Sequence, residues 1–131
     1  MFFSRAQEVA LASLVHLDRR GPAGAGRGVR DLAAAAGVPA PFLSKVLGRL
    51  VDRGLLRSRR GRKGGFVLGR PAAEITLADV VLALERKGDL EAAFRAPEGA
   101  AAPLFARLRG DFLETLRATS LADVPPPAPP D

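Results

Sequence analysis

Residues 38–68 read VPAPFLSKVLGRLVDRGLLRSRRGRKGGFVL, and this stretch decides the fold. Apolar residues recur in its first part at positions 43, 46, 47 and 50, which is the spacing of one face of a helix. Two short runs, at 55–59 and 66–68, then enclose a tip rich in glycine and basic residues. The stretch therefore predicts a helix from Pro41 to just before Gly54, followed by a β-hairpin.

A shorter helix is predicted immediately before this one, at residues 29–36. Gly37 suits the position that follows a helix, and Val38 and Pro39 form a brief turn. Two helices joined by such a short turn containing glycine are typical of a helix-turn-helix motif.

The rest of the chain predicts three further helices. Ser4 and Gln7 have capping-box spacing at the start of one, and Thr76 and Asp79 at the start of another. The last helix has apolar residues every four positions, so it can cover the main core or pack against a second copy of the chain. We expect these helices at residues 4–19, from Thr76 to Gly88, and at 103–118.

The positive charge of the chain is concentrated in one segment. The chain has 131 residues and a net charge of +6, from 20 Lys and Arg against 14 Asp and Glu. Between Lys45 and Arg70 there are nine cations and a single anion, Asp52, so the rest of the chain carries a net charge of −2. Such a block is typical of a surface that binds a polyanion, with an ordinary solvated basic surface as the alternative.

One face of the predicted helix after Pro39 carries the same signal. Small and basic residues lie together on it without a carboxylate: Pro41, Ser44, Lys45, Gly48 and Arg49. Small residues let a helix approach a groove closely, and Ser, Lys and Arg donate hydrogen bonds to bases or phosphates. The alternative is a plain solvent face, which normally mixes in Glu and Asp.

The hairpin tip, residues 60–65, is a second candidate contact. Its basic side chains can reach a minor groove, and its glycines allow a tight loop close to a backbone. A nucleotide-binding loop fits less well, because the G-x-x-x-x-G-K-[ST] pattern is missing and no helix follows directly.

Composition excludes several classes of site. The chain has no cysteine and one histidine, which excludes disulfides, thiolate metal sites and multi-histidine metal sites. No apolar run approaches the ~20 residues of a membrane span, and the N-terminus is unlike a signal peptide. Glu8, His16 and Asp18 share one helix without forming a convergent catalytic constellation. We expect a cytoplasmic protein that is not an enzyme, with no catalytic residue, metal, cofactor or membrane partner.

The order of elements, with a basic hairpin after a helix-turn-helix and a long helix at the end, is that of a winged-helix regulator. The sequence resembles the IscR/NsrR/CymR-type (Rrf) family of bacterial winged-helix transcription factors up to about Val124. The hairpin together with the I-T-L-x-D-V segment is the most specific part of the resemblance. The matching stretches are Asp31–Ala33, Gly37–Val38, Phe42–Leu47, Gly54–Leu56, Arg60–Gly61, Gly64–Phe66, Ile75–Val80, Phe112–Glu114 and Thr119–Asp123.

The resemblance implies a homodimer on a pseudo-palindromic double-stranded DNA operator, with a recognition helix in each major groove and a wing at each minor groove. The residues implied at base edges are Pro41, Phe42, Ser44 and Lys45. The other predicted DNA-binding residues are Arg49, Arg57, Arg59, Arg60 as the wing arginine, Arg62, Lys63, Gly64 and Gly65. The dimer would be joined through the last helix, by Leu104, Phe105, Leu108, Phe112, Leu113 and Leu116.

The sequence departs from the family in its sensing segment. Many relatives ligate an iron–sulfur cluster through three cysteines before the long helix, and the corresponding segment here, 89–103, has none. Ala and Gly cannot replace thiolates, so cluster sensing is excluded by chemistry. Glu8, near where some relatives supply a carboxylate ligand, is interpreted as a surface or salt-bridge residue, and His16 as a structural residue in preference to a heme ligand.

We predict a mainly α protein with a small β-hairpin. It is divided into a winged helix-turn-helix DNA-binding domain at 1–88, a mobile loop or frayed helix at 89–102, a dimerisation helix at 103–124 and a disordered proline-rich tail at 125–131. The predicted function is a cluster-free, homodimeric, sequence-specific DNA-binding regulator that acts as a repressor, with an unknown effector or protein partner left open. The alternative is a winged-helix protein-interaction adaptor without specific DNA binding.

Overall fold

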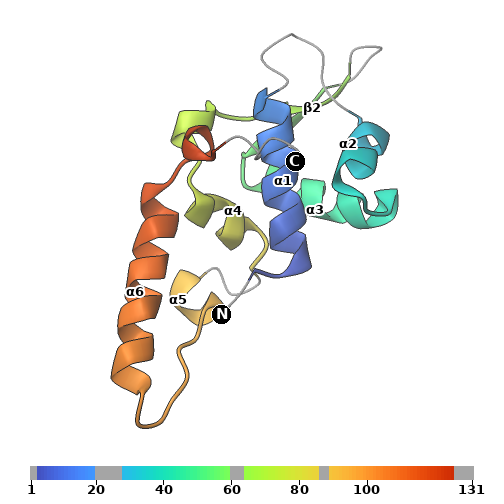
Figure 1. The fold of residues 1–131 in the computed structure, drawn as a ribbon. Coiled ribbons are helices and arrows are strands. Elements are labelled where there is room, and N and C mark those ends of the chain that lie inside the picture. Colours follow the sequence, from blue (N-terminus) through green and yellow to red (C-terminus); the bar gives the residue numbers. More distant parts are fainter. Residues whose placement is uncertain (1–2, 20–27, 60–63, 86–88, 126–131) are drawn as a thin grey trace, which may run out of the picture.

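The computed structural model describes residues 3–19, 28–59, 64–85 and 89–125. In Figure 1, α6 lies along the side of the molecule away from α2 and α3, with α1 and α4 between them. The elements in chain order are α1 (Arg5–Arg19), α2 (Val29–Ala36), α3 (Ala40–Asp52), β1 (Leu56–Arg59), β2 (Gly65–Leu68), η1 (Ala72–Glu74), α4 (Leu77–Ala83), α5 (Leu90–Ala93), α6 (Ala102–Ala118) and η2 (Leu121–Asp123), where η denotes a 3-10 helix.

The predicted helix-turn-helix is confirmed as α2 and α3. Gly37 ends α2 with a φ of 68°, a left-handed conformation that glycine adopts without steric cost, and its N–H donates to the carbonyl of Ala33. Pro39 precedes α3, and a further proline stands in the first turn of that helix. The apolar stripe of α3 is buried as its spacing predicts, at Leu43, Val46, Leu47 and Leu50.

The predicted hairpin is confirmed as an antiparallel pair, with Leu56 opposite Leu68 and Arg59 opposite Gly65. Gly65 begins β2 with a φ of 115°, a backbone angle that residues other than glycine rarely adopt. The hairpin closes at its base, where the N–H of Gly69 donates to the carbonyl of Leu55 at 2.9 Å. Residues 60–63 of the predicted tip lie outside the described residues.

Both predicted capping boxes are present. The N–H of Gln7 donates to Ser4 Oγ at 3.2 Å, and the N–H of Ser4 donates to Gln7 Oε1 at 2.8 Å. Thr76 and Asp79 make the same reciprocal pair, with both hydrogen bonds at 3.0 Å. These bonds satisfy backbone donors that the first turn of a helix leaves without partners, so each box sets where its helix begins.

The predicted end of the fourth helix is wrong. Helix α4 stops at Ala83, well before Gly88, which lies outside the described residues. The N–H of Leu84 donates to the carbonyl of Val81 at 3.1 Å, and the N–H of Glu85 to that of Leu82 at 3.2 Å. These shorter-range hydrogen bonds tighten the chain into a 3-10-like turn, which ends the α-helix.

Two apolar cores meet at α4. The main core joins α1, α2, α3, β1 and α4 around fully buried residues such as Leu14, Leu47 and Val80. The second core joins α4 to α5 and α6 through Val81, Leu90, Phe94, Leu113 and Leu116, among others. Helix α4 therefore connects the helix-turn-helix to the long α6, because it packs one side into each core.

The chain returns to the main core after α6. The N–H of Leu77 donates to the carbonyl of Thr119, and the N–H of Leu121 to that of Ile75, both at 2.9 Å. Leu121 is buried in the main core, and η2 lies against η1. Residues 119–123 are thus packed with the helix-turn-helix domain. Within the described part of the chain, no helix has the length and hydropathy needed to cross a membrane.

Candidate nucleic-acid interface

The outer face of α3 is exposed where the sequence predicts a contact surface. Pro41, Ser44, Lys45 and Gly48 are all exposed, on the side of α3 away from the buried leucines. Phe42, implied at a base edge, is half-buried and packs against the main core. The accessible part of this face is therefore small or basic, and Phe42 contributes packing as well as surface.

Arg49 is exposed but has a partner within the protein. Its Nη1 donates to the backbone carbonyl of Leu84, just beyond α4, at 2.9 Å. The sequence alone predicts Arg49 among the DNA-binding residues, because it shares a helix face with Ser44 and Lys45. A hydrogen bond to a residue 35 positions along the chain leaves no local sequence signal.

The hairpin adds basic side chains beside α3, because β1 follows that helix after one turn. Arg57 and Arg59 are two positions apart in β1, so their side chains point to the same side of the strand. Both are exposed. Gly64 and Gly65 are half-buried. The predicted wing residues Arg60, Arg62 and Lys63 lie outside the described residues, so their geometry is not part of the interface described.

An ion pair joins the base of the hairpin to α4. Arg70, two residues after β2, approaches the carboxylate of Asp79 with its Nη2 at 3.6 Å. Asp79 also forms the capping box of α4, so the same carboxylate contacts both the helix start and the hairpin. Both side chains are more than a third exposed, which limits such a pair to a small contribution to stability.

The arrangement of α3 and the hairpin suits recognition of a duplex. A single α-helix fits the major groove of B-DNA, and the small residues on the face of α3 allow its backbone to come close to base edges. Lys45, Arg57 and Arg59 supply positive charge on neighbouring elements, where phosphates would flank that groove.

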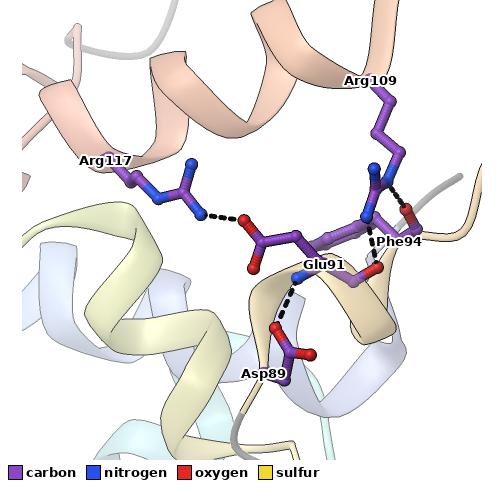
Figure 2. Close-up of polar contacts among 5 residues, drawn as sticks. All are labelled: Asp89, Glu91, Phe94, Arg109 and Arg117. Atoms are coloured by element: carbon purple, nitrogen blue, oxygen red, sulfur yellow. Dashed lines mark hydrogen bonds and ion pairs between the residues drawn. The ribbon is translucent and has the colours of Figure 1, made fainter. Parts of the chain in front are cut away.

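On the opposite side of the molecule, two arginines of α6 hold α5 in place (Figure 2). Arg109 donates to the backbone carbonyls of Phe94 and, at 2.7 Å, of Glu91. Arg117 forms an ion pair with the Glu91 carboxylate, and Asp89 accepts a hydrogen bond from the N–H of Glu91 at 3.0 Å. The hydrogen bond from Arg117 is the main reason that the pKa of Glu91 falls from 4.5 to about 2.

The apolar stripe predicted for dimerisation divides into two parts. Leu113 and Leu116 are buried in the second core of their own chain, at 3% and 2% exposed. Phe112 packs edge-on against Phe94, with ring centroids 5.0 Å apart, and Phe105 is half-buried. Leu104 and Leu108 remain 56% and 47% exposed. The N-terminal half of α6 is thus the part that presents apolar surface to solvent.

Comparison with known proteins agrees with this geometry. The Rrf2 family, described as "Iron-dependent Transcriptional regulator", matches residues 3–126. The chain belongs to the Rrf2 family. The resemblance stated from the sequence and the predicted winged-helix class are both confirmed.

A named relative and two solved structures of similar fold show what the chain is similar to. The "Putative HTH-type transcriptional regulator Rv1287" of Mycobacterium tuberculosis is 39% identical over 103 residues, which cover 72% of this chain and 63% of that protein. The chain thus spans less than two thirds of that relative. The structure of CymR, the global cysteine regulator of Bacillus subtilis, has a TM-score of 0.79 at 25% identity, covering 94% of this chain and 95% of CymR. Staphylococcus aureus CymR has a TM-score of 0.75 at 28% identity, covering 92% and 94%.

The residues of this Rrf2 chain do not fit an iron–sulfur cluster. The sequence holds no cysteine, and its single histidine, His16, is half-buried in α1. Among the described residues, no three His, Cys, Asp or Glu side chains gather in a way that could hold a metal ion. The cluster-free character expected from the sequence therefore rests on the absence of thiolate donors.

Proposed function

We propose that this Rrf2 chain is a homodimeric, sequence-specific DNA-binding repressor of bacterial transcription that acts in the cytoplasm without an iron–sulfur cluster. The observation that carries the proposal is the exposed face of α3, with Ser44 and Lys45 beside the small Pro41 and Gly48. Family membership supports the same reading, since transcriptional regulation is the description of the Rrf2 family.

In this proposal α3 reads the bases and the hairpin holds the backbone. Pro41, Ser44 and Lys45 approach base edges in the major groove, with Phe42 at the border of the core. Arg57 and Arg59 neutralise phosphates along β1. The tip residues assigned to the minor groove and its phosphates are Arg60, Arg62, Lys63, Gly64 and Gly65.

The proposed dimer uses α6. Leu104 and Leu108 give its N-terminal half an apolar surface that a second α6 could cover. A two-fold dimer presents two copies of α3, which is the symmetry of a pseudo-palindromic operator. Occupancy of that operator blocks access to the promoter, so no chemical step is needed and we propose no enzymatic activity.

The decisive experiment is a footprint on genomic fragments followed by gel-shift titrations of the protected site. We expect a palindromic footprint and an affinity that falls steeply with salt, by ~0.9 in log K per log unit of salt for each phosphate contacted. Lys45→Ala and Arg60→Ala should weaken operator binding, whereas Glu98→Gln, an exposed change in the segment before α6, should not. Binding without any sequence preference would rule the proposal out.

The repressor role is tested in cells with a reporter placed behind the footprinted promoter. Deletion of the gene should raise reporter output, and a fall would instead indicate an activator. The same strains test for an effector or protein partner, because growth conditions that relieve repression would reveal its class. A protein that binds partners but protects no DNA would favour the adaptor alternative.

A further inference from the structure

The C-terminal end of α4 is a joint between three helices. Arg49 of α3 donates its Nη1 to the carbonyl of Leu84 at 2.9 Å. Gln7 of α1, buried to 3% exposure, donates its Nε2 to Glu85 Oε1 at 2.7 Å. Two adjacent residues after α4 therefore accept hydrogen bonds from the two helices that pack beside it.

The carbonyl that Arg49 contacts is one that needs a partner. The last carbonyls of a helix have no intrahelical donor, and a cationic side chain near that end satisfies them and opposes the helix dipole. Leu84 and Glu85 already use their own N–H groups in tight turns to Val81 and Leu82. Arg49 thus supplies from α3 a donor that the end of α4 does not provide for itself.

The position of Arg49 on α3 suits this role better than contact with a base. It stands one turn after Lys45 and three residues after the buried Val46, at the border between the exposed face and the core. A guanidinium held by the protein at this border constrains how α3 lies against α4. Any rotation of α3 would carry Lys45 and Ser44 with it.

We propose that Arg49 is a positioning residue: through the Leu84 carbonyl it sets the orientation of α3, and with it the discrimination between operator and non-specific DNA. The inference rests on the proposed function and assigns Arg49 a role different from that of Lys45. Because α4 also packs against α5 and α6 through Val81, the joint lies between the second core and the recognition surface.

The test compares Arg49→Met with Lys45→Met, which remove one charge each from positions four apart on α3. In the free protein, Arg49→Met should speed amide hydrogen exchange at Leu84 and Glu85, and Lys45→Met should leave it unchanged. On DNA, Arg49→Met should lower the ratio of operator to non-specific affinity roughly 3- to 10-fold, the effect of one lost hydrogen bond, while the salt slope stays as in the parent protein. Arg49→Lys, which keeps a donor, should recover part of both effects. Arg49→Ala, which also removes the donor and the charge, replaces the methionine variant if that protein does not fold.

Three results would overturn the inference. A salt slope reduced by ~0.9 per lost contact in Arg49→Met would make Arg49 a phosphate ligand. Faster exchange with unchanged discrimination would make the bond merely structural. Unchanged amide exchange at Leu84 and Glu85 would mean that the hydrogen bond from Arg49 does not stabilise the end of α4. The unmutated protein tests the proposed function separately from the role of Arg49. If it shows no preference for the operator, both the proposed function and the positioning role fail. If it shows that preference, the Arg49 variants test the positioning role alone.

Discussion

Gly48 combines a cost to stability with a use in recognition. It lies in the middle of α3 on the exposed face, and a β-carbon added there would meet nothing within 4 Å. Glycine in a helix interior costs about 1 kcal/mol relative to alanine. A glycine at an open helical position is what close approach of the helix backbone to DNA would require.

We therefore expect Gly48→Ala to stabilise the protein and weaken its DNA binding. The free energy of unfolding should rise by about 1 kcal/mol, measured by urea denaturation. Operator affinity in gel shifts should fall, because the added methyl group stands between α3 and the base edges. Improved stability with full affinity would show that the helix does not approach DNA at this point.

Gly69, unlike Gly48, lies where the structure leaves no room for a side chain. A β-carbon there would lie 2.3 Å from the carbonyl oxygen of Gly54, which belongs to backbone that cannot move aside cheaply. Gly69→Ala should lower the free energy of unfolding by about 1–3 kcal/mol, the usual cost of overpacking. Gly110→Ala is the matched control, because its surroundings in α6 are open and it should not destabilise the protein. Equal stability of the two variants would contradict the close approach at the hairpin base.

At the scale of elements, the α5 segment shows how polar contacts hold a helix of only four residues. Helix α5 is too short to be stable alone, and its residue Leu90 and the following Phe94 are buried in the second core. Arg109 and Arg117 add the hydrogen bonds and the ion pair drawn in Figure 2. The predicted frayed helix or mobile loop at 89–102 thus contains one anchored helical turn, and its mobility stays a prediction.

The ion pair predicts an acid-dependent loss of stability. The pKa of Glu91 is lowered from 4.5 to about 2 in the folded protein, chiefly by the hydrogen bond from Arg117. As pH falls, the unfolded chain takes up this proton first, so the stabilisation is complete above about pH 4.5 and is lost as pH falls toward 2.

Thermal unfolding across that acid range provides the measurement. The Tm of the parent protein should fall more than that of Glu91→Gln, which has no proton to take up. Glu98→Gln serves as the control and should follow the parent protein. Parallel Tm curves for the parent and Glu91→Gln would show that the pair contributes nothing measurable, as happens for many exposed pairs.

At the scale of the whole molecule, α6 shares its apolar residues between its own chain and solvent. The four-residue spacing predicted one continuous stripe, yet Leu116 is buried in the second core while Leu104 is 56% exposed. The division arises because, within the described residues, the second core takes in α6 side chains only from its C-terminal half, at Phe112, Leu113 and Leu116, on the side where α4 lies (Figure 1). The exposed half is the surface that the proposed dimer would bury.

We expect Leu104→Asn with Leu108→Asn to convert the proposed dimer into a folded monomer. Loss of apolar contact weakens the interface, while the second core keeps its own residues. Light scattering should report the 13.7 kDa mass of one chain, with an unchanged circular dichroism spectrum. Ala106→Asn, an exposed change on another side of α6, should remain dimeric. A dimer in the double variant would place the interface elsewhere.

Local patterns in the sequence were enough to predict α1, α2, α3, the start of α4, α6, two capping boxes, the helix-turn-helix and the hairpin. Each helix signal depends on residues within about four positions of one another, as for Thr76 with Asp79, so its physical cause is visible in a short window. The hairpin follows from two strand-like runs that lie close together in the chain. The candidate surface on α3 followed from the same periodicity, because burial of Leu43 and Leu47 turns Ser44 and Lys45 outward.

Only the tertiary structure decided which partners those elements meet. The bond from Arg49 to Leu84, the early end of α4, the return of Leu121 to the main core and the division of the α6 stripe all depend on distant segments. A guanidinium at an exposed helical position looks the same in sequence whether it meets a phosphate or a carbonyl. Which of the two it meets is set by packing across the chain, because packing brings the end of α4 within hydrogen-bonding reach of α3.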